Sequence, residues 1–230
     1  MKKDISKIFV SRQIEYLKKR SSHFLETQGI ALLTGEIGSG KTTFMRWFLN
    51  SLNHNSYKFI YLSHTAITAR SFFRIIAREL DLTPKYFFED VAAQIRRELS
   101  DIYRKQKLKP ILVIDEAQNL SDTVLEEIRL LTNFRMDSKN YLSIFLLGPP
   151  VLKGRLKLSP YAALKQRISF VYHLTGLEQD ETNPYLMHRL KLAGKTESLF
   201  TDEAVTLLFH LYRYDERFER TAQGYQHNGA

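Results

Sequence analysis

One short stretch of the sequence combines glycines, a lysine and two threonines at a spacing that suits phosphate binding. Residues 35–43 read GEIGSGKTT and match the pattern G-x-x-x-x-G-K-[ST], the P-loop. Its glycines let the backbone turn tightly so that N–H groups point at phosphate oxygens. We predict that Lys41 contacts the β- and γ-phosphates and that the Thr42 hydroxyl ligates Mg²⁺. The predicted nucleotide-binding residues are Gly35, Glu36, Ile37, Gly38, Ser39, Gly40, Lys41, Thr42 and Thr43.

A pair of carboxylates follows a second apolar run and could complete such a site. Residues 110–116 read PILVIDE, four apolar residues that run into two acids. We predict that Asp115 holds Mg²⁺, directly or through water, and that Glu116 is the general base for the attacking water. A Glu here favours ATP hydrolysis over GTP switching, in which a Gln usually orients the water. The alternatives are a glycine-rich turn without ligand and a strand end with solvated acids.

Both motifs need a scaffold that carries the ends of two strands to one edge of a sheet. Short apolar runs rich in β-branched residues predict buried strands at residues 30–34, 59–63, 111–115, 142–148 and 169–174. Helical patterns accompany them at residues 42–52, 71–82, 87–105 and 122–131. This alternation predicts an α/β fold with a mostly parallel sheet flanked by helices. Ligands of such sheets bind outside the carboxyl ends of the strands, so both motifs should meet there.

The pattern changes near residue 176, where strands give way to helices alone. We expect an α/β domain over residues 1–176, with residues 1–28 as a basic helical lead-in. Residues 177–215 are expected to form a small, incomplete helical lid. The polar, Gly-containing residues 216–230 are expected to be a disordered tail.

Composition narrows the function classes. The chain has 230 residues and no cysteine, which excludes disulfides, zinc–thiolate sites and cysteine nucleophiles. No apolar run approaches the roughly 18 residues of a membrane span, and the start lacks the apolar segment of a secretory signal. We therefore expect a cytoplasmic protein without membrane insertion. The 34 Lys+Arg against 25 Asp+Glu give a net charge of +9, which favours a polyanionic partner such as nucleic acid.

Most of the excess charge lies in one window, residues 138–177. It contains Lys139, Lys153, Arg155, Lys157, Lys165 and Arg167 and no acid. In an oligomer such a stretch could follow a phosphate backbone. The alternative is a solvated basic face that partly serves as a subunit interface. The interleaved aromatic residues of this window are expected in the core rather than as stacking platforms.

With these motifs the chain resembles AAA+ ATPases with a P-loop. More narrowly, it resembles the ExeA/general secretion pathway protein A group, whose transposon-borne relatives act with transposases in the manner of TniB, TnsC and MuB. The resemblance spans residues 7–209 and is carried by LLTGEIGSGKTTFMRWFLN, VIDEAQNLSDTVLEEIRLLTNF, LSIFLLG, LKQRISFVYHLTGL and LFTDEAVTLLF.

This resemblance implies ligands, partners and further site residues. It implies ATP and Mg²⁺ as ligands, an ATP-dependent homo-oligomer, and duplex DNA and a transposase as partners. It also implies a catalytic Arg167 that reaches the γ-phosphate of a neighbouring subunit, where the alternative is a basic surface residue. Phe9 and Arg12 match the segment that lines the adenine pocket.

The sequence departs from the family pattern in three places. Gly148-Pro149-Pro150 replaces the common Gly-Gln-Pro, and Pro149 has no side-chain donor to sense the γ-phosphate. The chain begins almost at the adenine segment, and after Phe209 it lacks the Gly-x-Pro-Arg that ends the lid. We therefore expect a copy truncated at both ends that binds ATP but hydrolyses it poorly. The alternatives are an ATP-binding oligomerising module or degenerate remnant, and a secretion-associated ATPase.

Overall fold

The computed structural model describes residues 8–63, 65–132, 140–195 and 197–211. The chain divides into two compact units: Ile14–Leu174, and Met1–Gln13 together with Thr175–Ala230. The domain boundary that the sequence suggests at residue 176 stays a prediction.

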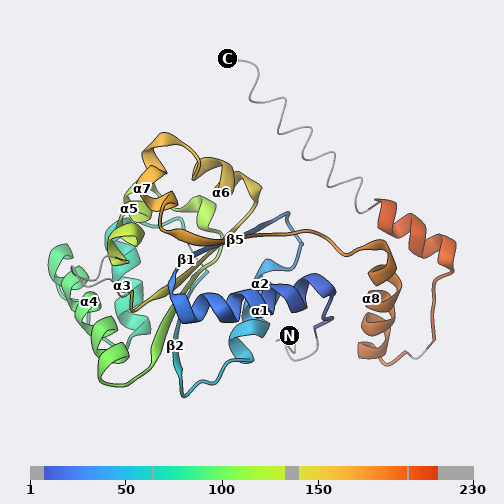
Figure 1. Ribbon diagram of the computed structural model, residues 1–230, viewed down its shortest axis with the longest axis horizontal. Helices are drawn as coiled ribbons and strands as arrows, with labels where there is room; N and C mark the ends of the chain where they lie inside the picture. Colours follow the sequence, from blue (N-terminus) through green and yellow to red (C-terminus); the bar gives the residue numbers. More distant parts are fainter. Residues whose placement is uncertain (1–7, 64, 133–139, 196, 212–230) are drawn as a thin grey trace, which may run out of the picture. The chain divides into compact units, whose positions relative to one another are not determined.

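The larger unit is built on a five-stranded parallel sheet with the strand order β2-β3-β4-β1-β5 (Figure 1). Its strands are β1 (Gly29–Gly35), β2 (Tyr57–Leu62), β3 (Lys109–Ile114), β4 (Ser143–Gly148) and β5 (Ile168–Leu174). Because all neighbours are parallel, the carboxyl ends of the strands share one edge of the sheet. The predicted α/β fold with a parallel sheet is confirmed.

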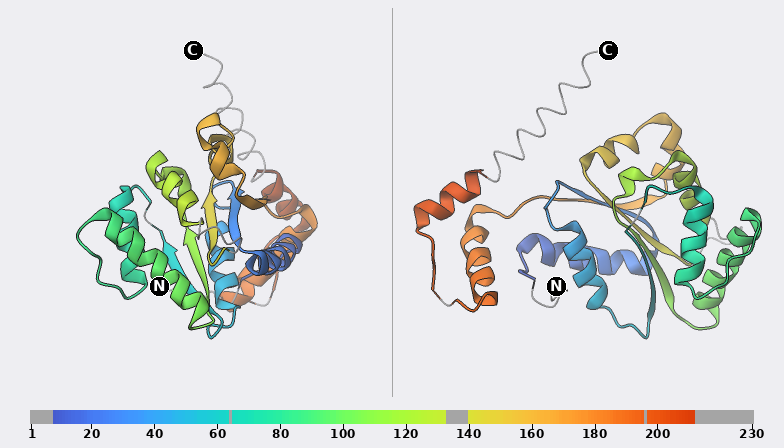
Figure 2. Two further views of the ribbon diagram at one scale, coloured as in Figure 1. Left: turned by 60° about the vertical axis from the view of Figure 1, so that its left-hand side comes forward. Right: turned by 180° about the vertical axis from the view of Figure 1, so that it is seen from behind.

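Helices cover both faces of this sheet (Figures 1 and 2). One face packs against α1 (Arg12–Thr27) and α2 (Lys41–Asn50). The other packs against α3 (Ala69–Glu79), α4 (Phe88–Arg104) and α5 (Asp122–Leu131). Short helices that the sequence analysis did not predict are η2 (Ala117–Asn119), α6 (Pro150–Arg155), η3 (Ser159–Tyr161) and α7 (Ala162–Lys165).

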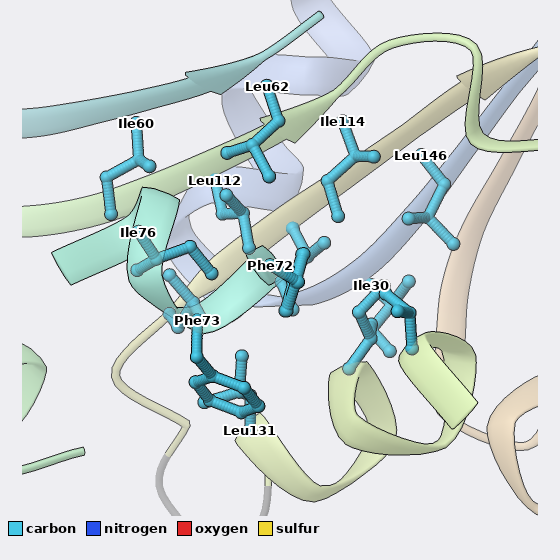
Figure 3. Packing of buried hydrophobic residues seen from close by; sticks show 14 of the residues in the cluster. Ile30, Ile60, Leu62, Phe72, Phe73, Ile76, Leu112, Ile114, Leu131 and Leu146 are labelled. Atoms are coloured by element: carbon cyan, nitrogen blue, oxygen red, sulfur yellow. The ribbon is translucent and has the colours of Figure 1, made fainter. Parts of the chain in front are cut away.

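Alternating side chains of the strands build two apolar clusters, one on each face. Ile30 and Leu32 of β1 pack with the helices α3 to α5, whereas Ala31 and Leu33 pack with α1 and α2. Figure 3 shows Phe72 and Phe73 of α3 among the side chains of the first cluster. Every residue of β1 and β4 is buried, as expected for central strands covered on both faces. This packing holds the strand ends, and hence the predicted site residues, in place.

The smaller unit contains α8 (Gln179–Leu192) and a helix over residues 202–211. Residues 8–11 are not helical, so the helix expected over 1–28 begins only at Arg12. The Arg12 side chain donates to Asp180 at 2.6 Å, and the Phe9 ring lies 5.7 Å from the Tyr185 ring. The expected tail, residues 216–230, lies outside the described residues. In the part of the chain that the structure describes, no helix is long and apolar enough to cross a bilayer.

Candidate nucleotide-binding site

The glycine-rich loop connects β1 to α2 at the carboxyl edge of the sheet. A Cβ on Gly35 would lie 2.5 Å from the carbonyl oxygen of Leu174 and 2.6 Å from Ser39 Oγ, so only glycine fits. Gly40 has a φ of +94° and precedes the first residue of α2. As the N-cap, Gly40 has no side chain to cap α2, which leaves the first N–H groups of the helix to an anion. Ile37 at the loop tip is 83% exposed.

Lys41 folds its side chain back over this loop. Its Nζ donates to the carbonyl oxygens of Gly35 and Glu36, both at 2.8 Å, and the residue is only 8% exposed. Burial lowers the pKa of Lys41, while the carboxylates of Glu116, Asp115 and Glu36 act in the opposite direction. The loop thus holds a buried cation on neutral carbonyl acceptors, for which charged phosphate oxygens would be stronger partners.

Asp115 links the end of β3 to the glycine-rich loop. Its Oδ2 accepts hydrogen bonds from Thr42 Oγ1 and from Tyr61 OH, both at 2.7 Å. Its Oδ1 accepts from the backbone N–H of Glu116 at 3.1 Å. The structure therefore brings Thr42 and Asp115 together, as the sequence predicts. A hydroxyl beside a carboxylate is an oxygen donor set that suits Mg²⁺, so these residues fit the metal.

Tyr61 is a site residue that the sequence analysis missed. It lies on β2 opposite Val113 of β3, and its ring is 5.8 Å from the Arg46 guanidinium. Burial, followed by the hydrogen bond to Asp115, raises the pKa of the Tyr61 hydroxyl, which therefore stays a donor. The sequence does contain a hint of this role. A tyrosine near the carboxyl end of an apolar strand needs a hydrogen-bond partner for its hydroxyl, and the predicted site lies at that end.

Glu116 adopts an unfavourable backbone conformation that contacts with neighbouring residues must stabilise. Its φ is +54°, in the left-handed region, which costs a side-chain-bearing residue about 1–2 kcal/mol. Its carbonyl oxygen accepts from the buried Thr65 hydroxyl at 2.7 Å. Its carboxylate Oε2 accepts from Gln118 Nε2 at 2.6 Å. Thr65 and Gln118 were also missed, because neither belongs to the two motifs.

Arg167 lies at the opposite edge of the sheet. It precedes β5, and its Nη1 donates to Thr132 Oγ1 at 3.3 Å. Its carbonyl lies beside Gly29, the first residue of β1, whereas the loop follows Gly35 at the other end. The first and last of the seven residues of β1 are six steps of about 3.3 Å apart, which separates the two edges by about 20 Å. The structure does not bring Arg167 to the loop of its own chain.

The remaining predicted residues each make contacts of their own or are exposed. Phe9 and Arg12 belong to the smaller unit and pack within it. In the basic window, Lys153, Lys157 and Lys165 are exposed, and Lys139 lies outside the described residues. Arg155 instead pairs with Asp122 and donates to backbone carbonyls. The aromatic residues of the window include Tyr141 and Phe170, both buried.

Comparison with known proteins identifies relatives of this architecture. A family described as "AAA domain" matches residues 23–156, more than half of the chain. General secretion pathway protein A of Aeromonas hydrophila is 34% identical over 190 residues, which cover 80% of this chain. They cover 34% of that protein, so the chain spans about a third of its relative's length.

Solved structures share the fold at low sequence identity. Cdc6p from Pyrobaculum aerophilum has a TM-score of 0.62 at 20% identity, covering 87% of this chain and 56% of that one. ORC1 of Aeropyrum pernix, solved in complex with DNA, has a TM-score of 0.60 at 16% identity, with coverages of 84% and 52%. A Walker-type ATPase of Pyrococcus abyssi has a TM-score of 0.58 at 21% identity, with coverages of 83% and 60%. Family match, fold and loop geometry agree: this chain belongs to the AAA+ ATPase family and is similar to general secretion pathway protein A.

Proposed function

We propose that the protein binds Mg²⁺·ATP at the loop of residues 35–43 and hydrolyses it with Glu116 as general base. One observation carries this proposal: the 2.7 Å hydrogen bond from Thr42 to Asp115, which joins the loop to the acidic pair. The two residues lie 73 positions apart. Membership of the AAA+ family supports ATP as the nucleotide.

Each residue then has a distinct role. Lys41 exchanges the carbonyls of Gly35 and Glu36 for charged phosphate oxygens, which bind an ammonium more strongly. Thr42 and Asp115 would hold Mg²⁺, which would supply positive charge beside the phosphates. Glu116 accepts a proton from the attacking water, a contribution of roughly 10²–10⁴ in rate.

Two substitutions test these roles. Glu116→Gln should keep ATP affinity and lower kcat by about 10²–10⁴, because the amide cannot accept the proton. Lys41→Ala should weaken ATP binding itself, measured by calorimetry. Glu15→Gln is the matched control, since that exposed carboxylate pairs with Lys19 on α1. Normal turnover by Glu116→Gln would show that another group is the base.

A second candidate is an ATP-binding module with little turnover. Pro149, which follows β4 and precedes α6, has no side-chain donor, and this favours slow hydrolysis. Pro149→Gln restores a polar side chain at the end of the strand and should then raise kcat. An unchanged kcat would contradict a limitation at this position.

We further propose that the protein acts on duplex DNA with a transposase, as a homo-oligomer. The net charge of +9 and the exposed Lys153, Lys157 and Lys165 support the contact with DNA. Exposed arginines at positions 70, 74 and 78 of α3 add a row on one helix face, about 12 Å long. ORC1, of similar fold, was solved with DNA. The alternative, a role in secretion, is favoured by the name of the Aeromonas relative.

Salt-dependent binding to duplex DNA separates these alternatives. The measured quantity is the slope of log K for DNA binding against log salt concentration. Replacing the three arginines of the α3 row by Gln should reduce the size of this slope by about 2.7, since each lost phosphate contact accounts for about 0.9. The same reduction is expected when Lys153, Lys157 and Lys165 are replaced by Gln. A matched triple at Lys19, Lys105 and Arg129 changes the same charge, but those cations pair with acids three or four residues earlier in the chain. Absence of ATP-stimulated binding at 50 mM salt would contradict the DNA role and favour secretion.

A further inference from the structure

The side chain of Gln118 lies directly against the proposed general base. It belongs to η2, two residues after Glu116, and its Nε2 donates to Glu116 Oε2 at 2.6 Å. Because a carboxylate only accepts hydrogen bonds, the amide must present its NH₂ group to Glu116. The other amide atom, Oε1, is buried and has no hydrogen-bond partner among the residues that the structure describes.

The end of β4 makes room for this amide. A Cβ on Gly148 would lie 2.9 Å from Gln118 Oε1 and 2.9 Å from Leu152 Cδ2. A side chain at position 148 would therefore displace the amide or the leucine. Packing against glycine thus confines the Gln118 amide between β4 and Glu116.

Arg155 anchors the backbone that carries Gln118. Its Nη1 donates to the carbonyl oxygens of Gln118 at 3.0 Å and of Leu120 at 2.7 Å. Its Nε donates to Tyr161 OH at 3.1 Å, and its guanidinium pairs with Asp122. The hydrogen bonds from Arg155 therefore restrain the backbone of η2, and with it the position of Gln118.

We propose that Gln118 is a positioning residue for Glu116 in ATP hydrolysis. By engaging Oε2, it holds the carboxylate in one orientation and leaves Oε1 of Glu116 to accept the proton. Glu116 is otherwise an exposed residue on a left-handed backbone, so its carboxylate would sample several orientations. The Gln118 oxygen is buried without a hydrogen-bond partner among the described residues, a cost that a structural role alone does not explain. This inference rests on the proposed function, because it requires Glu116 to be the base.

The test replaces the amide without emptying its space. Gln118→Met keeps the length of the side chain and removes the donor, and Gln118→Ala removes both. In the full chain, each should lower kcat about 10- to 100-fold, the scale of a misplaced catalytic group. The KM and the ATP affinity from calorimetry should stay within about twofold of the unsubstituted protein. The same holds for the KM and affinity of the control Gln106→Met, because Gln106 is exposed. Added to Glu116→Gln, Gln118→Met should cause no further loss, since the two act as one unit.

The outcomes separate this inference from the proposed function. Full turnover by Glu116→Gln would overturn the proposed function and the inference with it. Loss of turnover by Glu116→Gln together with full kcat in Gln118→Met would overturn the inference alone. A parallel loss of ATP affinity, or a lowered unfolding midpoint, in Gln118→Met would show a structural role and would also overturn it.

Discussion

Asp115 is a carboxylate that folding removes almost entirely from water. It is 6% exposed, and burying a charge is costly unless hydrogen bonds replace the lost water. Thr42, Tyr61 and the backbone N–H of Glu116 supply such bonds. The same contacts orient the oxygens toward the loop, so stability and the proposed metal site depend on one set of donors.

Replacing Tyr61 by Phe removes one of these donors and keeps the ring. Hydrogen bonds to charged groups contribute about 1.5–3 kcal/mol, so Tyr61→Phe should lower the free energy of unfolding by about that amount. Urea denaturation measures it. Tyr57→Phe is the matched control, because Tyr57 lies at the other end of β2 and stacks on Phe59. Equal destabilisation by both variants would mean that the Asp115 contact contributes nothing of its own.

At the level of elements, the carboxylate of Asp122 connects α5 with η3 and α6. Asp122 opens α5 and accepts from Tyr161 OH of η3 at 2.6 Å and from Arg155 of α6. The Tyr161 hydroxyl, followed by the Arg155 guanidinium, holds the pKa of Asp122 below its usual value of 3.8. This contact fixes the α6–η3 connection that supports η2 and hence Glu116.

The lowered pKa makes this contact depend on pH. A carboxyl with a depressed folded pKa stabilises the fold above its unfolded value, and that stabilisation is lost as pH falls through the folded value. Asp122→Asn should therefore lower the urea midpoint at pH 7, with a deficit that narrows below about pH 3.8. Glu126→Gln, which breaks a pair within α5 alone, should give a smaller deficit at pH 7. A deficit for Asp122→Asn that is independent of pH would contradict this assignment.

At the scale of the whole molecule, a catalytic role for Arg167, as proposed, would need a second chain. Arg167 lies about 20 Å from the loop of its own chain, across the length of β1. An arginine there can act on a bound nucleotide only if another copy presents its loop to it. If Arg167 is catalytic, the protein must therefore act as a homo-oligomer. An arginine supplied by a neighbouring subunit can raise the rate by about 10³ or more.

Mixing two inactive variants tests this arrangement. Arg167→Ala and Glu116→Gln should each be inactive alone. Mixed with ATP, they should regain turnover, because a loop from the first variant then meets Arg167 from the second. Arg167→Ala mixed with Lys41→Ala should regain turnover in the same way, as a second combination. Mixtures as inactive as their components, despite assembly by light scattering, would contradict a role in trans.

Sequence alone determined the loop, the acidic pair and the α/β alternation, because each is a local pattern. GEIGSGKTT and PILVIDE each place their chemistry within a few residues, and apolar runs identify strands whatever their order. Local patterns were less informative for the short helices α6 and α7, whose few residues give little periodicity.

Only the tertiary structure decided which side chains support the site. Tyr61 meets Asp115 from 54 positions away, and Arg155 meets the Gln118 carbonyl from 37 positions away. Both contacts depend on β3 lying between β2 and β4, an order set by the packing of whole elements. Gln118 is near Glu116 in sequence, yet its contact needs the left-handed turn at Glu116 and the space beside Gly148. Such contacts arise from long-range packing, which no short stretch of sequence encodes.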